Sequence, residues 1–468
     1  MEYVSTRGGT KSLSFCEAVL EGLARDGGLY VPQTWPTFSP DEIAAMAGRP
    51  YGDVAHQVIK KFSGDEIDTD DLKAMIDDAY GTFHHAAIAP LIQLDEKHFI
   101  LELFHGPTLA FKDVAMQLLS RLMDHILARG EKRATIVGAT SGDTGGAAID
   151  AFKGRENTDI FILFPNGRVS DVQRRQMTTL PDRNVHALAI DGTFDDCQAI
   201  VKAMFTNERF RDKVALSGVN SINWGRIVAQ IVYYFTAATA LGAPHRPVSF
   251  TVPTGNFGDI FAGYVAKRMG LQINRLVIAT NRNDILARTL ETGRYESRAV
   301  EKTISPSMDI QVSSNFERLL FDLSGRDSAS VNRWMESLKQ SGAFEIDTDT
   351  LIGLRSDFNA GRTDEDETQA EIARCWRSMH YLLDPHTAVG TVVARHVGEH
   401  HPIMVTLATA HPAKFPDAVK AASGEHPALP SWASHIMTKE ERFTVLPNDR
   451  GTVERFIEEH SRAVRLVT

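Results

Sequence analysis

The chain contains few cysteines and no long apolar segment. Its 468 residues include three cysteines, at Cys16, Cys197 and Cys375. Because their number is odd and they lie far apart in the sequence, neither a disulfide framework nor a zinc cluster is expected. The most apolar run, residues 227–241, contains a glutamine and two threonines and is shorter than the roughly 20 residues that a membrane span needs. These absences predict a cytoplasmic protein without a metal centre or a membrane span.

Positive charge is too scarce for a nucleic-acid-binding protein. Lys and Arg total 50 against 60 Asp and Glu, which gives a net charge of -10, and no concentrated basic stretch stands out. The N-terminal segment has no apolar run of the kind found in signal peptides, so we expect none. With 43% hydrophobic residues, a chain of this length can form two or three domains around a large core.

Short β-rich runs alternate with helix-length stretches through much of the chain. This alternation predicts βαβ units, and therefore an α/β fold with mostly parallel twisted sheets. We expect an N-terminal domain over residues 1–95, an α/β core over 96–280, a mainly helical insertion over 281–380, and a return to the core with a C-terminal region over 381–468. The expected strands are FILEL, ATIVGAT, DIFILF, VHALAI, VSFTVPT, RLVIAT and PIMVTLAT.

Two of the predicted strand-to-helix connections are rich in glycine: ATIVGATSGDTGGAAI and VSFTVPTGNFGDIF. Such a loop presents backbone N–H groups and the positive end of a helix dipole, which together favour phosphate binding. Either loop alone is explained equally well by a tight turn, but Ser141, Thr144 and Asn256 favour ligand binding. The carboxylates of Asp143 and Asp259 would repel phosphate, so each is expected to cap its helix or to orient a neighbouring group.

One lysine interrupts the apolar stretch HGPTLAFKDVAMQ. Lys112 lies three residues before Ala115, on the apolar side of a predicted helix. Burial and the positive helix terminus would both lower the pKa of its amine, and such a lysine can act as a nucleophile or form a Schiff base. Alternatively, Lys112 reaches the surface or pairs with Asp113 or Glu102. The two phosphate-binding loops favour the first interpretation, because a phosphorylated aldehyde cofactor needs one lysine and one such loop.

Eight blocks follow one another from residue 5 to about residue 419: STRGG, LELFHGPTLAFKD, GATSGDTGGAAI, NSINWGRI, VPTGNFGDIFAGYVAKRMG, ISPSMDIQVSSNFERLLF, DPHTAVG and TLATAHPAKFPDAV. Together they resemble the threonine synthase family in its bacterial and fungal branch. The resemblance implies a two-subdomain pyridoxal-phosphate core like that of tryptophan synthase β (fold type II), with an N-terminal domain and a helical insertion. It also implies a carbon–oxygen lyase that converts O-phospho-L-homoserine and water into L-threonine and phosphate, the last step of threonine biosynthesis.

The resemblance further implies roles for individual residues. Lys112 would bind the cofactor covalently and act as the main catalytic base, and the hydroxyl of Thr409 would contact the pyridine nitrogen. The partner of the cofactor's 3'-oxygen stays open, because plant-type relatives carry Asn where this chain has Asp143. The expected cofactor-phosphate loop is Gly255, Asn256, Phe257, Gly258 and Asp259. The expected substrate residues are Ser141, Thr144, Asn220, Ser221, Asn223 and Arg226, the last as a bidentate partner for phosphate.

Two alternative functions stay open at this point: a related serine/threonine dehydratase-like lyase, and a catalytically silent relative that binds a phosphorylated ligand. A dehydratase has no use for a second phosphate site, and a pure binding protein needs no Schiff-base lysine. The only expected partner is the small-molecule substrate, with the chain as a monomer or homodimer. The histidine pairs at 84–85 and 400–401 are expected at the surface, and His386 is expected to be structural or close to the cofactor.

Overall fold

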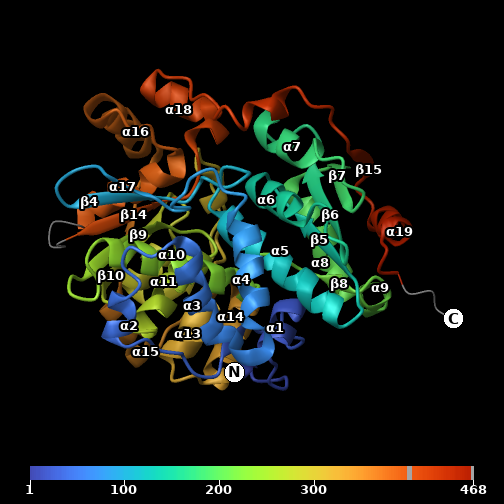
Figure 1. Ribbon diagram of the computed structural model, residues 1–468, viewed down its shortest axis with the longest axis horizontal. Helices are drawn as coiled ribbons and strands as arrows, with labels where there is room; N and C mark the ends of the chain where they lie inside the picture. The colour runs from blue at the N-terminus through green and yellow to red at the C-terminus, as the bar shows by residue number, and fades with distance from the viewer. Residues whose placement is uncertain (398–402, 465–468) are drawn as a thin grey trace.

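The computed structural model describes residues 1–397 and 403–464, and two sheets dominate it (Figure 1). The six-stranded sheet, on the left of the figure, is parallel except for the β3–β4 pair. Its strands in spatial order are β13 (Phe358–Arg362), β10 (Ile273–Thr280), β9 (Val248–Pro253), β14 (Met404–Ala408), β4 (His98–Glu102) and β3 (Leu91–Gln93).

The five-stranded sheet, on the right of Figure 1, is parallel throughout. Every residue of β6 is buried, as expected for a strand in a parallel sheet with both faces covered. The predicted runs coincide with strands of the two sheets, so the α/β prediction with mostly parallel pairing is confirmed. The strands in spatial order are β15 (Thr444–Pro447), β7 (Val185–Asp191), β6 (Thr158–Pro165), β5 (Ala134–Ala139) and β8 (Leu216–Ser217).

Helix α5 (Lys112–Arg129) runs between the two sheets, near the centre of Figure 1. Most of its apolar residues are buried, because α5 packs against two helices. These are α6 (Asp143–Phe152) and α10 (Trp224–Ala240). Helix α10 also packs on α11 (Gly258–Arg268). The other helices of this region are α7 (Asp171–Thr178), α8 (Phe194–Thr206), α9 (Glu208–Lys213) and α12 (Ile285–Thr292).

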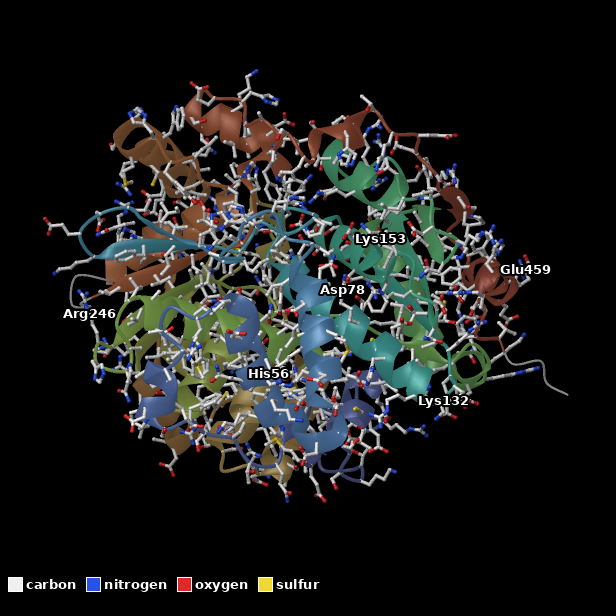
Figure 2. The ribbon with its side chains drawn as sticks, viewed as in Figure 1. His56, Asp78, Lys132, Lys153, Arg246 and Glu459 are labelled. Carbon is white, nitrogen blue, oxygen red and sulfur yellow. The ribbon has the colours of Figure 1, made fainter. Side chains whose placement is uncertain are left out.

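The N-terminal residues cover one face of α5 and α10. Tyr80 donates a hydrogen bond to the Val114 carbonyl, and Arg121 of α5 binds Asp78 of α4, with 2.7 Å between Nε and Oδ2. Figure 2 labels Asp78 near the middle of this face. The elements are β1 (Tyr3–Ser5), α1 (Phe15–Glu21), β2 (Tyr30–Pro32), α2 (Pro40–Ala44), α3 (Tyr51–Ser63), the 3-10 turn η1 (Gly64–Glu66) and α4 (Thr69–Tyr80).

Residues 281–380 are mainly helical, but they also supply a strand to the six-stranded sheet. Strand β13 pairs in parallel with β10, although its sequence FNAGR gives little strand signal. The expected domain boundaries at 95, 280 and 380 stay predictions. After α12, the segment contains β11 (Arg294–Glu296), η2 (Pro306–Met308), α13 (Phe316–Leu323), α14 (Ser328–Ser341), β12 (Ala343–Glu345), α15 (Thr348–Asp357), β13 and α16 (Glu365–Met379).

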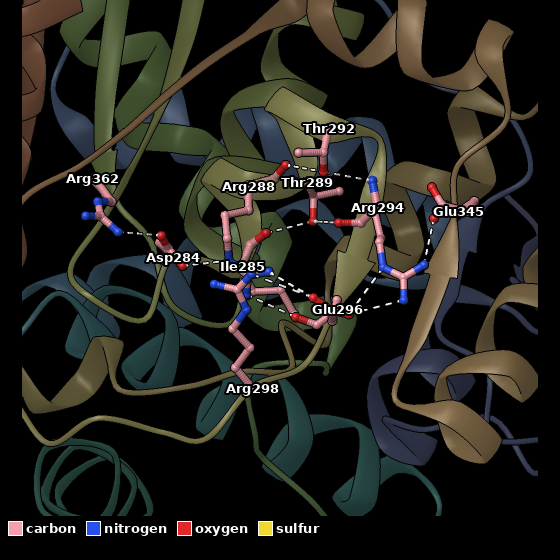
Figure 3. A network of polar contacts seen from close by, with 10 residues as sticks. All are labelled: Asp284, Ile285, Arg288, Thr289, Thr292, Arg294, Glu296, Arg298, Glu345 and Arg362. Atoms are coloured by element: carbon pink, nitrogen blue, oxygen red, sulfur yellow. Dashed lines mark hydrogen bonds and ion pairs between the residues drawn. The ribbon is translucent and has the colours of Figure 1, made fainter.

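A network of ion pairs fastens this segment to the sheet (Figure 3). Buried Asp284, just before α12, accepts from Arg288 at 2.8 Å and from Arg362 of β13 at 3.0 Å. Arg294 of β11 binds Glu345 of β12 at 2.8 Å. The pairs therefore hold α12 to the edge strand and join β11 to β12, which form a two-stranded antiparallel sheet.

The C-terminal residues contribute to both sheets. Strand β14 lies within the six-stranded sheet, whereas β15 pairs with β7 at the edge of the other sheet. The remaining elements are α17 (Pro385–Val397), η4 (Pro412–Lys414), α18 (Pro416–Ser423), η5 (Ser434–Met437) and α19 (Arg450–His460).

One buried arginine connects the N-terminal residues to the loop before α10. Arg318 is fully buried and donates to the Tyr30 carbonyl at 3.0 Å and the Ile222 carbonyl at 2.5 Å. Arg318→Met should lower the free energy of unfolding by about 2–6 kcal/mol, since each buried carbonyl left without a donor costs about 1–3 kcal/mol. The measurement is equilibrium unfolding in denaturant, with the exposed Arg298→Ala as control. Equal stability of the two variants would contradict this role for Arg318.

Candidate active site

Lys112 is the first residue of α5 and lies at the end of the six-stranded sheet. The loop that leads into α5 follows β4. It contacts the loop that follows the neighbouring strand β14, because Phe111 N–H donates to the Thr409 carbonyl at 2.8 Å. Parallel neighbours end at the same sheet edge, so residues nearly 300 positions apart meet here. Thr409, expected beside the cofactor ring, therefore lies next to the backbone that carries Lys112.

The Lys112 amine is buried and faces a carboxylate from the other sheet. Its side chain is 12% exposed, and Nζ lies 3.8 Å from Oδ2 of Asp143. Burial lowers the pKa of Lys112, and Asp143 opposes that effect. The alternative partners are engaged elsewhere: the Asp113 carboxylate accepts from Thr108, and the Glu102 carboxylate accepts from the Tyr381 hydroxyl and lies 2.7 Å from His105.

Asp143, the first residue of α6, is the centre of a polar cluster and does not cap its helix. Its Oδ1 accepts from Lys414 and from Gln173, both at 2.9 Å, and its Oδ2 accepts from the Ser307 hydroxyl at 3.3 Å. Burial acts to raise the pKa of Asp143, but the two lysines outweigh it and hold that pKa well below its usual range. The carboxylate is therefore ionised at neutral pH.

The first glycine-rich loop is shaped by its own hydroxyl and by packing. Thr140 Oγ1 accepts from Gly142 N–H and Gly145 N–H, each at 2.9 Å. Gly142 has φ of 155°, and a Cβ there would lie 2.4 Å from the Gln173 side chain, so only glycine fits. Ser141 is exposed at the loop tip and Thr144 is half-buried in the first turn of α6, on the loop that carries Asp143.

The second loop joins β9 to α11 and leaves the helix N-terminus without a side-chain cap. Phe257 adopts the left-handed conformation, with φ of 64°, and its buried ring packs on Phe316. The Gly255 carbonyl accepts from Ser313 at 2.7 Å, and the Asn256 carbonyl accepts from the Asn315 amide at 2.9 Å. These two loop carbonyls are thus hydrogen-bonded within the protein, whereas the uncapped N–H groups at Gly258 fit a phosphate.

Asp259, in the first turn of α11, points toward two tyrosines and does not cap its helix. The hydroxyls of Tyr233 and Tyr234 both donate to its Oδ1. Its Oδ2 is buried and has no hydrogen-bond partner among the described residues. Burial raises the pKa of Asp259 to about 7, so near neutral pH this side chain is often protonated.

Arg226 of α10 is a buried cation that pairs with no carboxylate of the described residues within 4.0 Å. One Nη donates to the Val219 carbonyl at 3.5 Å, and Nε is buried without a partner. Burial lowers the pKa of Arg226 to about 10, which leaves the guanidinium charged at neutral pH. A buried charge without a counter-ion is costly, so this geometry favours an anionic ligand.

Three residues of the loop before α10 were expected to bind the substrate, and they differ in burial and in their contacts. Asn223 is fully buried and caps α10: its side-chain oxygen accepts from Gly225 N–H, and its nitrogen donates to the Val19 carbonyl. Both ends of this amide thus bind the protein itself, and the expected substrate role of Asn223 stays a prediction. Asn220 is exposed and Ser221 is half-buried, so their side chains remain candidates for substrate contact.

Several residues of the site had no signal in local sequence. Lys414, Gln173, Ser307 and Asn315 reach it from separate elements, and only the fold brings them together. His386 was expected to be structural or close to the cofactor; its Nε2 accepts from Ser307 N–H at 3.1 Å and its Nδ1 lies 2.8 Å from Asp384. The ring thus orients the segment that contacts Asp143.

Other expectations concern metals and membranes. Within residues 1–397 and 403–464, no group of His, Cys, Asp and Glu could hold a metal ion, and no helix is long and apolar enough to cross a membrane. His84 stacks on Trp432, with 3.7 Å between ring centroids. His400 and His401 lie outside the described residues.

Family comparisons agree with this site. Residues 84–334 match the model of pyridoxal-phosphate dependent enzymes, residues 2–80 that of the threonine synthase N terminus, and residues 387–457 that of the threonine synthase C-terminal region. The chain is therefore a pyridoxal-phosphate-dependent enzyme. The buried lysine and the uncapped glycine loop fit that cofactor.

Individual relatives indicate which kind of pyridoxal-phosphate-dependent enzyme this chain is. A threonine synthase from Pseudomonas aeruginosa is 52% identical over 462 residues, which cover 98% of each chain. The crystal structure of pyridoxal-phosphate-bound threonine synthase from Brucella melitensis has a TM-score of 0.97 at 62% identity, covering 99% of this chain and 100% of that chain. The structure of the yeast threonine synthase has a TM-score of 0.93 at 42% identity, over 98% of each chain. This chain belongs to the threonine synthase family.

The raised pKa of Asp259 should appear in the stability of the enzyme without cofactor. Because the folded-state pKa of about 7 exceeds the ordinary value of 3.8, the folded state binds more protons than the unfolded state between about pH 4 and pH 7. Wild type should therefore lose stability relative to Asp259→Asn as pH rises through that range, by up to about 4 kcal/mol, with no further change above it. The measurement is denaturant unfolding of both proteins at several pH values; a difference independent of pH would refute the assignment.

Proposed function

We propose that the enzyme converts O-phospho-L-homoserine and water into L-threonine and phosphate. The observation that carries the proposal is the position of buried Lys112 between the two glycine loops, close to an arginine that lacks a counter-ion. One loop suits the phosphate of the cofactor, and the arginine suits a second phosphate. The close relation to threonine synthases over nearly the full chain supports this substrate.

Lys112 has the environment that a base needs. Its lowered pKa increases the fraction of neutral amine, and its place at the start of a rigid helix fixes the backbone from which the side chain extends. When bound, pyridoxal phosphate supplies an electron sink for carbanion chemistry on the substrate. The amine of Lys112, held beside the bound substrate, would carry protons between neighbouring carbon atoms of that substrate.

The cofactor would be held at its two ends. Gly255, Asn256, Phe257 and Gly258 would bind its phosphate at the α11 N-terminus, and Thr409 would face its pyridine nitrogen. A neutral hydroxyl does not keep that nitrogen protonated, which suits chemistry beyond the α-carbon. Asp143, with Oδ2 3.8 Å from Lys112 Nζ, would be a candidate partner for the cofactor's 3'-oxygen.

The substrate phosphate would be bound by Arg226, assisted by Ser141, Thr144, Asn220 and Ser221. A guanidinium binds phosphate through two parallel hydrogen bonds, and Nε of Arg226 is free to make one of them. The substrate of a serine/threonine dehydratase carries a hydroxyl where phosphohomoserine carries its phosphate, so it would bring no phosphate to this arginine. We further propose that the enzyme acts in the cytoplasm as a monomer or homodimer, with its small-molecule substrate as its only required partner.

Replacing Lys112 should abolish both the cofactor colour and the activity. Purified wild type should be yellow, whereas Lys112→Ala should lose the absorbance that borohydride reduction removes in wild type, along with threonine formation. Lys153→Ala is the matched control, because its amine lies at the surface (Figure 2), 42% exposed. A colourless but fully active wild type would rule out the proposal.

Replacing Arg226 should chiefly weaken substrate binding. Arg226→Ala should raise KM for phosphohomoserine by about 10- to 150-fold, the equivalent of a lost charged hydrogen bond of about 1.5–3 kcal/mol. Steady-state phosphate release measures this, and Arg25→Ala, whose side chain is 75% exposed, serves as control. An unchanged KM would remove Arg226 from the substrate site.

A further inference from the structure

A second lysine lies in the site, completely removed from solvent. The side chain of Lys414, in η4 after β14, is 0% exposed. Its Nζ donates to the Thr108 carbonyl at 2.7 Å, to Asp143 Oδ1 at 2.9 Å and to Gln176 Oε1 at 3.1 Å. Three acceptors match the three protons of an ammonium group, so Lys414 has no proton left for a ligand.

Asp143 consequently lies between two lysines. Lys414 contacts one of its oxygens and Lys112 approaches the other, at 3.8 Å. With Lys112 alone, a buried carboxylate would hold that lysine as an ammonium ion, which is neither a nucleophile nor a base. A second cation on the same carboxylate offsets this effect.

We propose that Lys414 is a positioning residue whose positive charge balances the negative charge of Asp143. Asp143 can then hold the Lys112 side chain in place without fixing a proton on the Lys112 nitrogen. This inference rests on the proposed role of Lys112 as the cofactor-binding lysine. Lys414 acts on Lys112 by its charge, both through the Asp143 that it binds and directly, and it touches neither Lys112 nor the substrate in this assignment.

The charges around Lys112 act in both directions. Asp143 from α6 and Asp113 from α5 raise the pKa of Lys112, whereas Arg226 from α10 and Lys414 from η4 lower it. Asp259 from α11 is the remaining acid near Lys112. Of the two cations, Lys414 is the one bound directly to the acid that faces Lys112.

These charges determine the direction in which each substitution should change the pKa of Lys112. Lys414→Met removes a buried positive charge, so the pKa of the Lys112 nitrogen should rise. Asp143→Asn removes the opposing negative charge, so the same pKa should fall. The double variant removes both charges and should return that pKa toward the wild-type value. A close charge moves a pKa by about 1–3 units, which is the expected size of the two single shifts.

The experiment is a pH titration of the visible absorbance of the cofactor-loaded enzyme without substrate, which follows the proton on the nitrogen shared by Lys112 and the cofactor. Gln176→Leu is the matched control, because it removes an uncharged contact of Lys414 and should leave the pKa in place. Lys414→Arg keeps the charge and should also retain it. For any variant whose colour does not titrate, the pH dependence of the rate of recombination with added pyridoxal phosphate gives the pKa of the free amine.

The outcomes are distinct. A rise in Lys414→Met together with recovery in the double variant supports the proposal. If Lys414→Met does not fold, the double variant compared with Asp143→Asn still isolates Lys414 and should show the higher pKa. A purely structural Lys414 would lower thermal stability while leaving every pKa unchanged, and that result overturns the proposal. Colour that survives in Lys112→Ala would instead contradict the assignment of Lys112, whatever Lys414 does.

Discussion

The buried contact between Asp143 and two lysines is the constraint on which the rest of the site depends. Asp143 belongs to α6, which follows a strand of the five-stranded sheet, whereas Lys112 and Lys414 follow neighbouring strands of the six-stranded sheet. The charges therefore meet across the boundary between the two sheets. Removing one partner would leave a buried charge uncompensated, so the two halves must approach each other in one arrangement.

The parallel topology explains why so many separate segments converge at this boundary. Strands β4, β14 and β9 are neighbours, and the loops after them carry Lys112, Thr409 and the glycine loop at Gly258. In open parallel sheets, ligand sites form beyond the carboxyl ends of the strands, because that is where such loops gather. Helix α5 then places the lysine at a helix start, where its side chain is buried from the first turn.

The sequence was sufficient to predict the fold class and to suggest residues for the candidate site. Continuous apolar runs between helix-length segments located the main strands, and the glycine loops and the unusual lysine were visible as local patterns. Strand β13 was missed, because FNAGR owes its pairing to β10 and not to its own propensity. Lys414 was missed because its partner, Asp143, lies 271 positions earlier, and no local pattern encodes such a contact. The capping role of Asn223 was not predicted, because a capping amide and a ligand-binding amide look the same in sequence.

The central claim is that Lys112, and not the more deeply buried Lys414, carries the cofactor. Reducing the yellow enzyme with borohydride, digesting it and locating the pyridoxyl group by mass spectrometry tests this most directly. The account predicts the group on the peptide that contains Lys112. A pyridoxyl group on Lys414, or on any other lysine, would contradict it.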